Sequence, residues 1–181
     1  MRLHLLTSLL AFGLASATWA VELRVHGLVS DHRTREPLQE ALVRVYKNGE
    51  KQHVFHTGPG GRYSVRLDNN AHYVIRFSAP GRVTKCFTVD TSGPAWADDK
   101  RATDLEVEMT LFEPVEGLDL GWFDMPMGMA RFTPMTGHIA WNADYERRIR
   151  PEVDRLMAEV ALRQAAIADR GTRLPVGTTR H

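Results

Sequence analysis

Cysteine is almost absent from this 181-residue chain, because Cys86 is the only one. A single cysteine excludes an intramolecular disulfide, so the fold must rest on an apolar core. Cys86 lies in an apolar, β-rich run, which favours a buried and inert thiol over an intermolecular disulfide.

Net charge and catalytic motifs are also missing. The chain has 23 basic and 22 acidic residues, and the first 20 residues contain only one of them, Arg2. The remainder lacks the basic excess of nucleic-acid-binding proteins, so we expect no nucleic-acid partner. Neither a G-x-S-x-G turn nor an H-E-x-x-H helix occurs. We therefore expect no enzymatic activity, no catalytic residue and no cofactor.

The N-terminus has the pattern of an export signal. Met1 and Arg2 precede an apolar run, and Thr18 and Ala20 place small residues before a cleavage point. Residues 1–20 are therefore predicted to be a signal peptide, which makes the protein periplasmic or secreted. An uncleaved anchor is the alternative. No later segment is long and apolar enough to span a bilayer.

A period of two dominates from Glu22 to Phe112, and it marks strands with one buried face. Gly, Pro and Asn turns separate the runs, and Asn48 and Gly49 predict a tight hairpin. The absence of β-α-β spacing excludes doubly wound folds. We predict a mainly β fold: a seven-stranded antiparallel sandwich over residues 21–112. The expected strands are 22–29, 41–46, 51–56, 62–67, 72–77, 83–90 and 105–111.

An ordered series of short motifs runs through the same half of the chain. It comprises Val25 to Asp31, Glu36 to Leu38, Ala41 to Val45, Thr57 with Gly58, Gly61 to Tyr63, Tyr73, Ser78 to Gly81, and Val89 with Asp90. In this order and spacing the series resembles carboxypeptidase-regulatory-like domains. The resemblance implies a transthyretin-like sandwich and an accessory role in folding, positioning or binding. Residues beyond Phe112 lie outside it.

The extension at residues 113–142 is rich in Gly, Pro, Met and aromatic residues. Two short runs, 131–133 and 138–141, are predicted to form a hairpin. Aromatic residues here and in the long 90–104 loop could contact a partner or pack onto the sandwich. These partner-binding candidates are Trp96, Trp122, Phe123, Phe132 and Trp141.

Methionines also gather in the extension. Met125, Met127 and Met129 alternate, and His138 follows nearby. Alternate residues of an extended segment fall on one side, and soft thioether sulfurs prefer Cu(I). These four residues are thus candidate copper ligands. The alternative is that the methionines fill gaps against aromatic rings.

Residues 143–170 show helical periodicity, with Val153, Leu156 and Val160 on one apolar face. Asn142 or Asp144 could cap a first piece, and Pro151 suits the first turn of a second. The apolar face could fold onto the sandwich or pair with a second copy in a homo-oligomer. Residues 171–181 are expected to form a disordered tail.

Together these features predict an exported, non-catalytic accessory module that binds an unknown protein partner in the cell envelope. The alternative is a periplasmic Cu(I)-binding protein that uses the methionine cluster.

Overall fold

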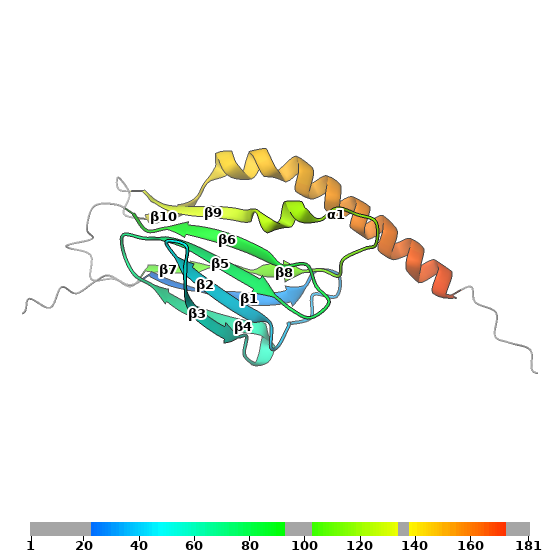
Figure 1. The fold of residues 1–181 in the computed structure, drawn as a ribbon, viewed down its shortest axis with the longest axis horizontal. Coiled ribbons are helices and arrows are strands. Elements are labelled where there is room, and N and C mark those ends of the chain that lie inside the picture. Colours follow the sequence, from blue (N-terminus) through cyan, green and yellow to red (C-terminus); the bar gives the residue numbers. More distant parts are fainter. Residues whose placement is uncertain (1–22, 93–102, 134–137, 173–181) are drawn as a thin grey trace, which may run out of the picture.

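The computed structural model describes residues 23–92, 103–133 and 138–172, which form a two-layered β-sandwich with one long C-terminal helix (Figure 1). The predicted signal peptide, Trp96 and residues 173–181 of the expected tail lie outside the described residues. The mainly β fold with a single C-terminal helix is confirmed.

The first sheet is built around β1 (Leu23–Asp31). This strand pairs antiparallel with β4 (Arg62–Leu67) and parallel with both β7 (Thr103–Glu106) and β8 (Met109–Leu111). β7 and β8 together cover the last predicted run, and Val107 and Glu108 separate them.

The second sheet has six strands in the order β10-β9-β6-β5-β2-β3. Its strands are β2 (Leu42–Lys47), β3 (Glu50–His56), β5 (His72–Ser78), β6 (Lys85–Asp90), β9 (Pro126–Thr133) and β10 (His138–Trp141). Short 3-10 turns occupy Pro59–Gly61 (η1) and Gly121–Asp124 (η2). β9 and β10 form the hairpin predicted in the extension, and β9 joins the sandwich by pairing parallel with β6.

The predicted tight turn between β2 and β3 is present. Asn48 has a φ of 52° and Gly49 a φ of 87°, both in the left-handed region that such turns require.

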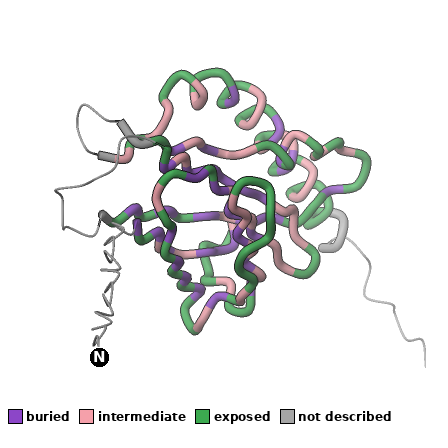
Figure 2. Tube along the Cα trace, turned by 60° about the vertical axis from the view of Figure 1, so that its left-hand side comes forward, coloured by how far each residue is buried: buried purple, intermediate pink, exposed green. Residues whose placement is uncertain are grey.

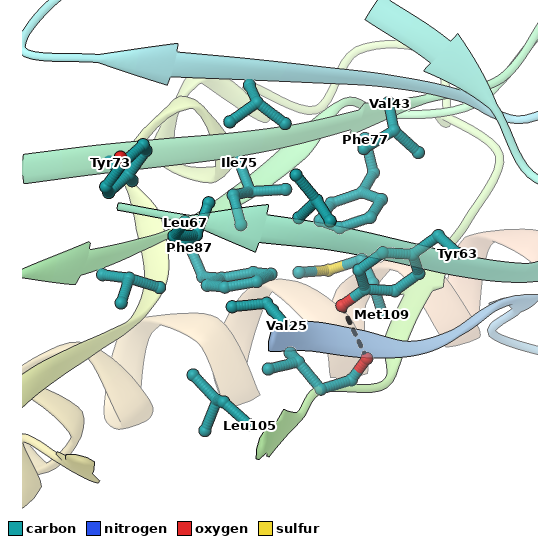
Figure 3. Packing of buried hydrophobic residues seen from close by; sticks show 14 of the residues in the cluster. Val25, Val43, Tyr63, Leu67, Tyr73, Ile75, Phe77, Phe87, Leu105 and Met109 are labelled. Atoms are coloured by element: carbon teal, nitrogen blue, oxygen red, sulfur yellow. Dashed lines mark hydrogen bonds between the residues drawn. The ribbon is translucent and has the colours of Figure 1, made fainter. Parts of the chain in front are cut away.

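The core lies between the two sheets and contains a row of aromatic rings (Figure 3). Tyr63 packs edge-on against Phe77 at 4.9 Å between ring centroids, and Phe77 stacks on Phe87 at 5.8 Å. Phe87 then meets Trp141 edge-on at 5.9 Å. The row therefore runs from the first sheet through the second to its last strand, and Trp141 belongs to it.

Gly27 on β1 allows a close approach of the chain between β7 and β8. A Cβ atom at this position would lie 1.9 Å from the carbonyl oxygen of Val107. That oxygen accepts a hydrogen bond from the buried Tyr63 hydroxyl at 2.8 Å. A side chain at Gly27 would therefore displace the segment that divides the two strands.

The helix α1 (Ala143–Thr172) crosses the β9 side of the second sheet and projects past the sandwich at its C-terminal end (Figure 1). Asn142 caps it, accepting a hydrogen bond from the Tyr145 backbone N–H at 3.0 Å. The predicted second start at Pro151 is wrong, because Pro151 lies inside one continuous helix.

The apolar face of α1 packs on its own chain, and Figure 2 shows buried positions recurring along it. Leu156 and Val160 form a second core cluster with Phe112, Val115 and Phe123. Beyond Val160, the described side chains of α1 are mostly exposed, as are Leu162 and Ile167. The homo-oligomer through α1 stays a prediction.

Candidate functional site

A groove of about 380 Å³ lies between the first half of α1 and the open side of the sandwich. This is within the size range of small-molecule sites. Its apolar lining is Phe87, Val107, Met109, Met127, Gly128, Trp141, Ile149 and Val153. Its polar lining is Lys85, Thr110, Glu108, Glu146, Arg150 and Asp154.

Trp141 and Gly128 shape one side of the groove. A Cβ atom at Gly128 would lie 2.8 Å from the Trp141 ring, so any residue other than glycine would displace the indole. Trp141 thereby packs on Phe87 and remains partly exposed to the groove. Among the aromatic candidates whose side chains the structure describes, Trp141 is therefore the one that lines this site.

Lys85 is the buried charged residue of the groove, with 7% of its surface exposed. It shares its strand phase with Phe87 and Val89, which belong to the sandwich core. The ammonium nitrogen lies 4.8 Å from the ring centroid of Phe112 and 5.2 Å from that of Phe123. Burial lowers the pKa of Lys85 to about 8. Within the described part of the chain, no hydrogen bond or ion pair to this ammonium is found.

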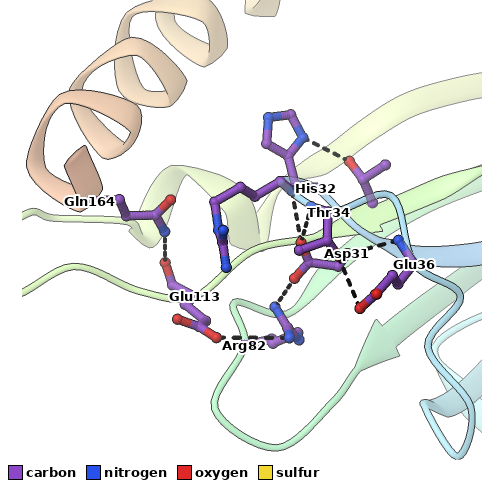
Figure 4. Close-up of polar contacts among 9 residues, drawn as sticks. Asp31, His32, Thr34, Glu36, Arg82, Glu113 and Gln164 are labelled. Atoms are coloured by element: carbon purple, nitrogen blue, oxygen red, sulfur yellow. Dashed lines mark hydrogen bonds and ion pairs between the residues drawn. The ribbon is translucent and has the colours of Figure 1, made fainter. Parts of the chain in front are cut away.

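His32 contacts the groove through Thr110, and Figure 4 shows it beside Asp31. Its Nδ1 is 3.3 Å from the hydroxyl oxygen of Thr110, which lines the groove. Burial and then the charges of Lys85 and Arg35 lower the pKa of His32, so the imidazole is neutral at pH 7.

A polar network fixes the segment that carries Phe112 (Figure 4). Asp31, buried at 7% exposure, forms an ion pair with Arg82, which also lies 3.8 Å from the Glu113 carboxylate. Gln164 on α1 donates a hydrogen bond to the Glu113 carbonyl at 3.2 Å. Next to this network, the Val83 backbone N–H donates to the carbonyl of Phe112 at 2.9 Å. The ring of Phe112 is thus held in place beside Lys85.

Asp31 is ionised in this network. Burial alone would raise its pKa, but backbone N–H groups of Thr34 and Arg33 and the charge of Arg82 together lower it. The carboxylate therefore keeps its charge well into the acid range.

The other aromatic candidates have different surroundings. Phe123 is fully buried in the second cluster, where it packs edge-on against Phe112 at 5.0 Å, so it offers no exposed surface to a partner. Trp122 is half-buried beside it, and its indole nitrogen is buried without a hydrogen-bond partner. Phe132 lies on β9, but its side chain is outside the described residues.

The structure does not bring the candidate copper ligands onto one face by simple alternation. Pro126 pairs with Cys86 and Met129 with Thr88, so three steps along β9 match two along β6. This bulge interrupts the alternation between Met127 and Met129. Met127 lines the groove and Met125 is 38% exposed.

The remaining copper candidate, His138, lies on β10, with its side chain outside the described residues. Among the described residues, no three His, Cys, Asp or Glu side chains group as metal ligands. In that same part of the chain, no helix has the length and apolarity to cross a bilayer.

Sequence comparison identifies no family for this chain. No protein-family profile matches it, and no curated protein has a matching sequence.

Solved structures with a similar fold do exist. 3-Chlorocatechol 1,2-dioxygenase from Rhodococcus opacus 1CP is 13% identical over 55% of this chain and 62% of its own, with a TM-score of 0.40. The Bacillus anthracis TIE protein is 13% identical over 51% of this chain and 18% of its own, with a TM-score of 0.42. The group B streptococcus pilus 2b backbone protein is 14% identical over 51% and 42%, with a TM-score of 0.38.

These likenesses cover 51 to 58% of this chain. The chain spans 57 to 62% of the first three dioxygenases found. The carboxypeptidase-regulatory-like family has no match.

The prediction that the chain is not an enzyme is contradicted by these comparisons. The similar structures include chlorocatechol, catechol and hydroxyquinol dioxygenases. The absence of familiar catalytic motifs therefore does not exclude catalysis by this chain. At 11 to 17% identity, the likeness transfers no activity to it.

Proposed function

We propose that the chain is an exported binding module of the cell envelope, built on a carboxypeptidase-regulatory-like sandwich, that holds a small apolar ligand in the groove beneath α1. The observation that carries this proposal is the groove itself. Partly exposed apolar side chains, among them Met127, Trp141 and Val153, line it above the buried core residues Phe87 and Met109.

The apolar surface that Met127, Trp141 and Val153 expose in the groove favours a ligand that covers it. Each Å² of apolar surface removed from water contributes roughly 25 cal/mol. The walls are also preformed, because Trp141 is fixed against Phe87 and α1 is tied to the sandwich at both ends of its packed half. Near its start, the Tyr145 hydroxyl donates to the Pro126 carbonyl at 2.7 Å. Farther along, Arg163 donates to the Glu116 carbonyl at 2.9 Å.

Export supports the same proposal from the sequence side. The signal-peptide pattern of residues 1–20 would deliver the module to the envelope, where a ligand or a partner protein is met. The expected check is that the protein recovered from the envelope fraction begins at Val21, as its intact mass would show. Recovery of the full-length chain from the cytoplasm alone would contradict export.

The groove is tested by an NMR titration of the mature chain with 1-decanol, a neutral apolar probe. We expect the amide signals of Met109, Gly128 and Ile149 to shift together, because these residues come from three walls of the groove. The exposed strand β3, with Val54 at 51% exposure, is the internal control for non-specific apolar contact. Shifts confined to β3, or none at all, would refute the groove as the binding site.

A further inference from the structure

We infer that the groove recognises small amphipathic carboxylates, with Lys85 binding the carboxylate end and the apolar walls holding the hydrocarbon. This inference rests on the proposed function and names its ligand class. It starts from the ammonium of Lys85, which is more than nine-tenths buried and borders the groove.

A buried charge is stable only where something compensates it. At Lys85 the protein supplies two phenyl rings, Phe112 and Phe123, but no carboxylate among the described residues within ion-pair distance. The attraction between a cation and an aromatic ring is weak compared with the attraction between a cation and an anion. An anionic ligand would complete the site, because its oxygens would accept hydrogen bonds from an ammonium that the described part of the chain leaves without a partner.

The neighbouring polar groups fit this assignment. The Thr110 hydroxyl lines the groove and can donate to a second carboxylate oxygen, since His32 in its neutral form can accept or donate at Nδ1. The titratable groups that face the groove from the other elements are Glu108, Glu146, Arg150 and Asp154. Glu108 and Asp154 are solvent-exposed, so water and salt screen them far more than they screen Lys85.

The size of the groove argues for a small molecule. A volume of about 380 Å³ is at the low end of the range for ligand pockets, which suits a single hydrocarbon chain with a headgroup. The acidic residues at the rim disfavour a second negative charge there. A monocarboxylate with a neutral hydrocarbon tail therefore matches both Lys85 at one end of the groove and the acidic rim.

Protonation links binding to pH. Because burial places the pKa of Lys85 near 8, part of the population has lost its charge at pH 8, and a bound carboxylate would raise that pKa again. Binding should therefore take up protons near pH 8 and weaken as the pH rises above it.

The test compares three probes with the same chain, decanoate, 1-decanol and decylamine, by isothermal titration of the mature protein at pH 7. We expect decanoate to bind at least about tenfold more tightly than 1-decanol, since hydrogen bonds to charged groups typically contribute that much. Lys85→Met should abolish this preference while 1-decanol still binds. The matched control is Lys51→Met on the exposed strand β3, which should keep the preference.

Each outcome is informative. If 1-decanol shifts the groove residues but decanoate binds no better, the carboxylate inference fails and the proposed apolar site stands. Tighter binding of decylamine would overturn the inference in favour of a cation site at the acidic rim. If ligand-free chains form a dimer that protects the groove amides from hydrogen exchange, the occupant is a second copy and the inference is also overturned.

Discussion

Replacing Lys85 with methionine should stabilise the free protein at pH 7. The pKa of Lys85 falls from 10.5 to about 8 on burial, which corresponds to a cost of about 3 kcal/mol for keeping the charge in the fold. Contacts of the ammonium with two aromatic rings offset roughly 1–2 kcal/mol of that cost. Methionine fills similar space without a charge, so the expected gain in the free energy of unfolding is about 1–2 kcal/mol.

The pH dependence of this gain has a defined sign. The folded-state pKa of Lys85 lies below the unfolded value, so folding disfavours the protonated form. The cost is complete below pH 8 and disappears as the pH rises towards 10.5. The difference between the wild type and Lys85→Met should therefore shrink over that interval.

Urea unfolding at pH 7 and at pH 10, followed by circular dichroism, measures both quantities. Lys51→Met is the control and should change stability by no more than about 0.5 kcal/mol, because Lys51 is exposed. If Lys85→Met destabilised the protein at pH 7, or if its effect did not vary with pH, Lys85 would not be a buried, uncompensated charge. Lys85 would then not be expected to bind a carboxylate in the groove.

Three further predictions concern the scaffold. Gly27→Ala should lower the free energy of unfolding by more than about 3 kcal/mol in urea titrations, because the new Cβ would overlap the Val107 carbonyl; an unchanged midpoint would contradict this packing. Asp31→Asn should cost about 3 kcal/mol at pH 7, since it removes the buried ion pair and leaves Arg82 only the more distant, exposed carboxylate of Glu113. Folding lowers the pKa of Asp31, so the wild type should lose this stabilisation only as the pH falls below about 4. The thermal unfolding temperatures of the wild type and Asp31→Asn should therefore converge in that range. A chain truncated after Phe112 should not refold as a monomer in size-exclusion chromatography, because Phe112 would lose its packing partners and β6 would lose its neighbour β9; a stable truncated monomer would show that the extension is dispensable.

Local periodicity explains which parts of the fold could be predicted. Residues such as Tyr63 and Val65 alternate with exposed neighbours, so β4 could be located without knowing its partner. The helical repeat of Leu156 and Val160 located α1 in the same way. The pairing of β9 with β6 could not be predicted, because no local pattern specifies which distant strand a segment will join.

The candidate site was only partly visible in the sequence. Trp141 was expected among several aromatic residues, and nothing in their spacing singled it out. Lys85 was missed, although a signal existed: it occupies the same phase as Phe87 and Val89, where an apolar residue is normal. The register shift between β9 and β6, on which the alternation of Met127 and Met129 depends, had no signal in the sequence, and copper binding by these residues stays a prediction.

The parallel pairing of β9 with β6 also determines where the second sheet ends. Without it, β6 would be an edge strand, and its first five residues, all buried now, would present unpaired backbone groups beside apolar side chains. Such edges template aggregation between chains. The extension supplies the missing neighbour from the same chain and moves the edge out to the four-residue strand β10. By covering β6, the extension prevents two chains from pairing along this edge.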